Sequence, residues 1–78
     1  MFDMGNFYLS CKDIDTKSLL SSIGSKEVGV VYREYCLLYP SKLVLTKLRK
    51  LSDMGFIEYG VSICGCWLTD LGVKYIMD

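Results

Sequence analysis

The chain has 78 residues, nine basic and nine acidic side chains, and no histidine. This length suits one small domain over residues 1–78, and the zero net charge gives no overall attraction to nucleic acid or anionic lipid. The absence of histidine excludes Ser-His and Cys-His catalytic pairs. No Gly-rich phosphate loop or paired carboxylates occur either, so we expect no enzyme and no cofactor.

The apolar content of 51% is too high for a disordered chain. It is also more than a small monomer easily hides, which favours a homodimer. No apolar run approaches the ~20 residues that a membrane span needs, and the first residues do not form a signal peptide. We therefore expect a cytoplasmic protein with no membrane partner.

Four cysteines are present, and their spacing bears on metal binding. A zinc site here would need cysteine ligands alone, and such sites usually contain two CxxC pairs. The chain instead has one CxC, Cys64 and Cys66, with Cys11 and Cys36 isolated. We expect no metal site, and we interpret the thiols as reduced apolar side chains. Cys64 and Cys66 are candidates for oxidation only if they are exposed.

The first half of the chain predicts an N-terminal arm or short strand over 1–12, followed by two helices. Asp13 or Asp15 can cap a helix over residues 16–23, which Gly24 would end. After a cap at Ser25, apolar residues recur at steps of three and four, which favours a second helix. A strand over 28–32 is the alternative, because β-branched residues cluster there. The apolar positions are Val28, Val31, Tyr32, Tyr35, Leu38 and Tyr39.

Pro40 ends that pattern, and a third helix is predicted from Ser41 to about Met54, stopped by Gly55. Its two faces differ in composition. Lys47 falls within the apolar arc, so its alkyl chain should pack there while its ammonium reaches the edge. The apolar arc holds Leu43, Val44, Leu48, Leu51 and Met54, and the opposite arc holds Lys42, Leu45, Thr46, Arg49, Lys50 and Asp53.

The last third of the chain predicts a hairpin and a short helix. Residues 56–59 and 64–68 suggest strands with a bend near Gly60. Trp67 lies on the second strand, and we expect it in the core. Thr69 is a suitable N-cap for a terminal helix, with Asp70 in its first turn.

This order of elements resembles the winged helix-turn-helix fold of small prokaryotic and phage transcription regulators. The resemblance covers residues 39–75. It rests on Gly55-Phe56-Ile57, on "WLTDLG" at 67–72, and on the leucine-type spacing of Val44, Leu48 and Leu51. It implies an α+β, mostly α fold with a three-helix core, a C-terminal β-hairpin wing and a short terminal helix. In that fold the third helix enters the major groove of DNA.

The resemblance and the basic outer arc predict a sequence-specific regulator that binds double-stranded DNA as a homodimer. Ser41 and Lys42 would meet phosphate at the helix N-terminus. Thr46 and Arg49 would face base edges, since arginine pairs bidentately with guanine. Lys47 and Lys50 would neutralise phosphates.

Two observations keep an alternative open. Basic residues on the outside of a helix are commonly just its solvated face. The predicted wing has no basic residue from Leu51 to Val73, and Val61 and Ile63 at its tip suggest a protein contact. The alternative is a winged-helix protein-interaction module without DNA binding, such as a small viral or mobile-element protein that docks on a host protein.

Overall fold

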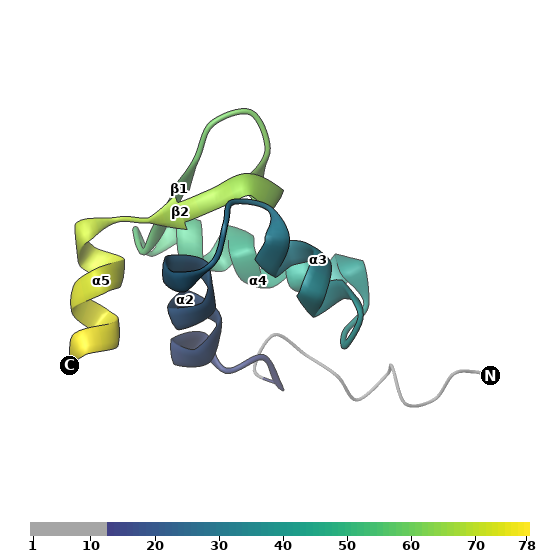
Figure 1. The fold of residues 1–78 in the computed structure, drawn as a ribbon, viewed down its shortest axis with the longest axis horizontal. Helices are drawn as coiled ribbons and strands as arrows, with labels where there is room; N and C mark the ends of the chain where they lie inside the picture. The colour runs from purple at the N-terminus through teal and green to yellow at the C-terminus, as the bar shows by residue number, and fades with distance from the viewer. Residues whose placement is uncertain (1–12) are drawn as a thin grey trace.

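The computed structural model describes residues 13–78, so the prediction for residues 1–12 lies outside the described residues. The described chain is mostly helical with a two-stranded antiparallel sheet, which confirms the α+β, mostly α class (Figure 1). Within this part, no helix combines the length and apolar character needed to cross a membrane. The elements are α2 Thr16–Ser25, α3 Val30–Cys36, α4 Ser41–Asp53, β1 Ile57–Tyr59, the 3-10 helix η2 Ile63–Gly65, β2 Cys66–Leu68 and α5 Asp70–Met77.

One hydrophobic core joins α2, α3, α4 and the hairpin. Helix α4 contributes Val44, Leu48 and Leu51, each at most 2% exposed, which confirms the central part of its predicted apolar arc. Helix α2 packs against α3, α5 and β2, so it lies between the two ends of the fold (Figure 1). The buried apolar residues are Ile14, Leu19, Leu20, Ile23, Val31, Val44, Leu48, Leu51, Ile57 and Cys66.

Helix α2 begins as predicted and ends later than predicted. The Asp15 carboxylate accepts a hydrogen bond from the Ser18 backbone N–H at 2.9 Å, which makes Asp15 the N-cap. The helix runs through Gly24 to Ser25, and the Lys26 N–H closes its last turn on the Ser22 carbonyl. The predicted stop at Gly24 and cap at Ser25 are therefore wrong, because a glycine inside a helix costs about 1 kcal/mol and does not have to end it.

Helix α3 is confirmed as a helix rather than a strand, but it is shorter than its apolar pattern. Gly29 has φ +90°, a left-handed conformation that starts the helix at Val30. Val28 and Leu38 lie outside the helix and are 65% and 73% exposed, so their predicted places on its apolar face are wrong. The turn before Pro40 is instead ordered by Tyr39, whose ring stacks on that of Tyr35.

Helix α4 ends at Asp53, one residue before the predicted Met54, and Gly55 beyond it has φ +85°, the left-handed conformation predicted there. The hairpin follows, with Ile57 opposite Leu68, Glu58 opposite Trp67 and Tyr59 opposite Cys66. The second strand begins at Cys66 rather than at Cys64, because residues 63–65 form η2.

The side chains of the hairpin alternate between the core and solvent. Ile57 and Cys66 are buried, so the neighbouring Glu58 and Trp67 point outward. Trp67 is 44% exposed, and its predicted core position is wrong for this reason. At the tip, Val61 is fully exposed while Ile63 packs against the core, so the two predicted contact residues have different environments.

Helix α5 is held at its start by Thr69. The Thr69 hydroxyl accepts a hydrogen bond from the Gly72 N–H at 3.1 Å and donates one to the Gly55 carbonyl at 2.5 Å. Gly72 is buried, and a Cβ there would lie 2.2 Å from the Phe56 carbonyl oxygen. The helix therefore approaches the backbone before β1 as closely as a glycine allows.

Candidate nucleic-acid interface

The outer face of α4 is the surface that the sequence predicted as a DNA contact. Because Val44, Leu48 and Leu51 point into the core, residues half a turn away point to solvent. Five of the six predicted contact residues are exposed, and we call them the outer row of α4: Lys42, Thr46, Arg49 and Lys50 on this face, together with Ser41 at the start of the helix.

Lys47 is the sixth predicted residue, and the structure places it elsewhere. It is only 8% exposed, and its ammonium donates a hydrogen bond to the Thr16 hydroxyl of α2 at 2.7 Å. The predicted packing of its alkyl chain is confirmed. Its charge, however, ends beside α2 rather than on the outer row, so we leave Lys47 out of the candidate interface.

Thr46 lies on the outer row, and its hydroxyl already donates a hydrogen bond within the helix. Its Oγ1 donates to the Lys42 carbonyl at 2.8 Å, one turn earlier in the helix. The oxygen lone pairs remain available. In this rotamer Thr46 can therefore accept a hydrogen bond, for example from an amino group on a base edge, but cannot donate one.

The cations of the outer row have no carboxylate partner within residues 13–78. The ion pair in this part of the chain joins Lys26 and Glu34 at 2.5 Å and involves none of Lys42, Arg49 and Lys50. Asp53 is exposed at the C-terminal end of the same face, so three cations share this surface with one acid. The local charge of the outer row is positive although the whole chain is neutral.

The N-terminus of α4 adds partial positive charge at Ser41. Pro40 occupies the N-cap, and no side chain caps this end of the helix. The first backbone N–H groups of a helix lack intrahelical partners and attract anions. Ser41 and Lys42, the two residues predicted to contact phosphate at this helix end, are the first two residues of α4.

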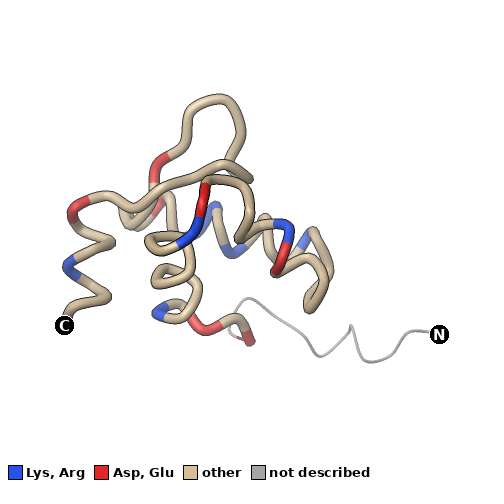
Figure 2. The backbone as a smooth tube through the Cα atoms, in the orientation of Figure 1, with Lys and Arg blue, Asp and Glu red and all other residues tan. Residues whose placement is uncertain are grey.

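The hairpin differs in charge from the outer row of α4. Glu58 is the single charged residue between Ile57 and Leu68, and Figure 2 shows the hairpin with one acidic segment and no basic one. A surface of this charge has no cation to offer a phosphate. The outward pairing of Glu58 with Trp67 was not predicted. The alternation of the strand contained that signal, because a buried Ile57 puts Glu58 on the other side.

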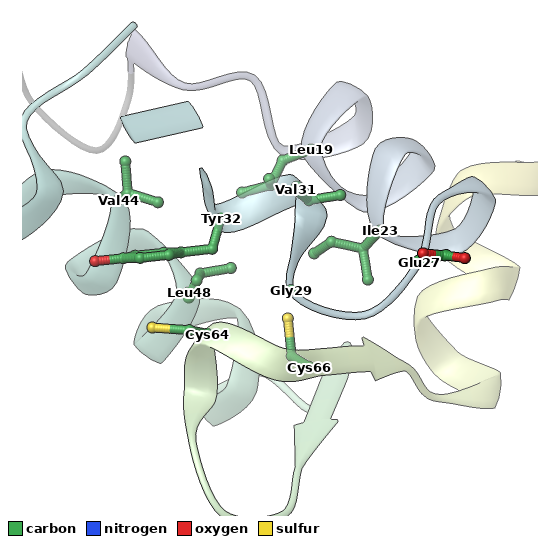
Figure 3. A pocket seen from close by; sticks show the side chains of 10 residues that line it. All are labelled: Leu19, Ile23, Glu27, Gly29, Val31, Tyr32, Val44, Leu48, Cys64 and Cys66. Atoms are coloured by element: carbon green, nitrogen blue, oxygen red, sulfur yellow. The ribbon is translucent and has the colours of Figure 1, made fainter. Parts of the chain in front are cut away.

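A small cavity lies between α2, α3, α4 and η2 (Figure 3). Its volume is about 10 Å³, the space of roughly one water molecule, so it cannot hold a cofactor. The Cys66 thiol points into it, and burial raises the pKa of that thiol (Figure 3).

Tyr32 also lines this cavity. The pKa of its hydroxyl is raised to about 12, mainly by a hydrogen bond with the Cys36 thiol. Within residues 13–78, no three thiol or carboxylate groups gather closely enough to hold a metal ion.

Comparison with protein-family models, with curated proteins and with solved structures found no match for this chain.

Proposed function

We propose that this protein is a winged-helix transcription regulator that binds double-stranded DNA through the outer row of α4. The observation that carries the proposal is the exposure of Lys42, Arg49 and Lys50, none of them paired with a carboxylate within residues 13–78. Cations already neutralised by protein carboxylates would gain little from phosphate. These three are available to displace counterions from DNA.

The arrangement of the elements supports the winged-helix part of the proposal. Helices α3 and α4 pack together and are joined by the short turn at Leu37–Pro40. The hairpin packs against α4 through β1 and η2, and α5 returns to α2. One face of α4 is thus fixed to the core along its length while the opposite face is presented to solvent, as a helix that enters a groove requires.

In the proposed complex each residue of the outer row has a separate role. Ser41 and Lys42 bind phosphate at the N-terminus of α4, and Lys50 binds phosphate from its flank. Thr46 and Arg49 lie one turn apart at the centre of the row and face base edges, where Arg49 can pair with guanine. Asp53 marks the end of the contact, because its carboxylate repels phosphate.

We propose that the DNA-binding form is a homodimer, since one helix of this length reads only a few base pairs. The surface for the second copy is an apolar patch where residues 54–56, which follow α4, meet α5. Phe56 and Tyr75 form its centre, with ring centroids 4.8 Å apart. Met54 and Leu71 beside them are 51% and 49% exposed. Burial of this patch in a dimer would remove apolar surface that a monomer leaves in water.

A mobility shift with random-sequence duplex at low salt tests the proposed function. Phosphate neutralisation does not depend on sequence, so even a non-cognate duplex should be retarded. Wild-type protein should bind, and the Arg49→Ala/Lys50→Ala double variant should bind more weakly. Equal binding by the two proteins would contradict the assignment of the outer row.

The second candidate function is a protein-interaction module without DNA binding. The observation that favours it is the exposed apolar surface of the hairpin, where Val61 is fully exposed and Trp67 is 44% exposed. Absence of any shift at low salt, with the protein shown to be folded, would favour this candidate over the first.

A further inference from the structure

We propose that the outward face of the β1–β2 hairpin binds a lysine or arginine side chain of a protein partner, between the carboxylate of Glu58 and the indole of Trp67. This proposed contact with a protein partner is independent of the proposed DNA binding, because it lies on the hairpin and the DNA contact lies on the outer row of α4.

The register of the hairpin brings the two side chains together. Glu58 and Trp67 are directly opposite each other in the antiparallel pair, and both project from the outer face. The Cβ atoms of such a pair are about 5 Å apart, so a carboxylate and an indole face share one site. Both residues are exposed, and within residues 13–78 no ion pair involves Glu58.

The surroundings of this pair favour a basic group with an apolar neighbour. The Trp67 ring extends toward Gly60, where a Cβ would lie 3.9 Å from its Cη2 atom, so the indole continues as far as the hairpin turn. Val61 follows in that turn and is fully exposed. A partner segment can therefore place its cation at Glu58 and an apolar side chain against Val61.

The chemistry of the site selects a cation. An indole face attracts ammonium and guanidinium groups through its quadrupole, and a neighbouring carboxylate adds a charge-assisted hydrogen bond. The hairpin itself has no lysine or arginine that could occupy the site from within the same element. Nucleic acid is disfavoured as the occupant, because the charge nearest to the indole is negative.

Trp67 is the single tryptophan of the chain, so its fluorescence reports on the site directly. The probe is the capped tetrapeptide acetyl-Leu-Arg-Leu-Arg-amide, titrated into the full-length protein. Acetyl-Leu-Gln-Leu-Gln-amide and acetyl-Leu-Glu-Leu-Glu-amide serve as neutral and acidic counterparts. We expect a saturable change of Trp67 emission with the arginine peptide, and binding at least about fivefold weaker for the other two.

Substitutions of charged residues distinguish binding at Glu58 and Trp67 from a general effect of the protein's charge. Glu58→Gln should weaken binding of the arginine peptide by about fivefold or more, because the indole remains and the charge is lost. Asp53→Asn is the matched control: it removes the same charge from an exposed position on α4 and should leave binding unchanged. Arg49→Ala/Lys50→Ala should also leave peptide binding unchanged, so failure of the DNA proposal and failure of this one can be told apart.

Three results would overturn the proposal. Equal affinity for the arginine and glutamine peptides would show that no cation is selected. Equal loss in Glu58→Gln and Asp53→Asn would show an effect of net charge alone. A saturable change of Trp67 emission with duplex DNA, in place of the peptide, would assign the hairpin face to nucleic acid.

Discussion

The ammonium of Lys47 on α4 donates a hydrogen bond to the hydroxyl of Thr16 on α2, at an Nζ–Oγ1 distance of 2.7 Å. This bond joins residues 31 positions apart and gives a partner to a lysine that is only 8% exposed. A buried charge is tolerated when it is hydrogen-bonded and is costly when it is not. The contact therefore ties the proposed DNA-binding helix to α2.

Removal of the Thr16 hydroxyl should destabilise the folded protein more than removal of the Lys47 charge. Thr16→Val leaves the ammonium without this partner and should lower the free energy of unfolding by about 1 to 3 kcal/mol. Lys47→Met keeps the packed alkyl chain and removes the charge, so its cost should be under about 1 kcal/mol. In the double variant the loss should be smaller than the sum of the two single losses. Chemical denaturation of the four proteins measures this coupling, and strict additivity would contradict it.

Lys47→Met also provides a matched control for DNA binding. Its ammonium points to α2, so its replacement should leave the affinity for duplex DNA within about twofold of wild type. Lys50→Met removes the same charge from the exposed outer row and should weaken binding several-fold. A mobility shift that compares the two variants at one salt concentration makes the distinction. Equal weakening by both would show that affinity follows net charge and not the outer row.

Gly72 should not accept a side chain. In most helices alanine is more favourable than glycine by about 1 kcal/mol. Here, however, the new Cβ would lie 2.2 Å from the Phe56 carbonyl oxygen, and α5 would have to move. Gly72→Ala should therefore lower the melting temperature. Gly60→Ala, whose Cβ meets Trp67 at an ordinary 3.9 Å, should change it far less. An unchanged melting temperature in Gly72→Ala would contradict the close packing of α5.

Asp15 predicts a loss of stability in acid. The hydrogen bond from the Ser18 backbone N–H lowers the pKa of Asp15 below its ordinary value of 3.8. The folded state thus favours the ionised cap. The stability that the ionised Asp15 cap contributes is present above the ordinary pKa of 3.8 and is lost as the pH falls through the lowered pKa. The Asp15→Asn variant retains a cap, but this cap does not titrate. Between pH 5 and pH 2, about the range in which aspartate titrates, the melting temperature of the variant should therefore fall less than that of wild type. Parallel curves for the two proteins would exclude this role of Asp15.

The proposed dimer depends on one side of α5. Leu71→Asp places a charge in the apolar patch with Phe56 and Tyr75 and should convert a dimer to a monomer. Val73→Asp is the control, because Val73 is similarly exposed at 43% but lies about 200° around the helix from Leu71. Sedimentation at high protein concentration gives the masses. A wild-type monomer, or dissociation of both variants alike, would contradict the assigned surface.

The features of the fold that could be predicted were those with strong local signals. Val44, Leu48 and Leu51 repeat at helical spacing, and Gly55 supplies the left-handed residue that ends α4, so both the helix and its buried face followed from sequence. The start of α5 could also be predicted from a local signal, because the Thr69 hydroxyl accepts a hydrogen bond from the Gly72 backbone N–H three residues later.

The features that could not be predicted depend on neighbours distant in sequence. The direction of the Lys47 ammonium is set by Thr16, which no spacing within α4 reveals. The exposure of Trp67 is set by its pairing with Glu58, which requires the register of the hairpin. The late start of α3 follows from the left-handed conformation of Gly29, which its sequence context permits but does not demand.

The salt dependence of duplex binding tests the central claim most directly. The slope of log K against log salt concentration becomes shallower by about 0.9 for each phosphate that the protein no longer neutralises. For Arg49→Ala/Lys50→Ala the slope should therefore be shallower than that of wild type by at least about 0.9, and by about 1.8 if Arg49 also meets phosphate. Equal slopes for wild type and the double variant, or no binding by wild type at low salt, would contradict the claim that the outer row of α4 binds DNA.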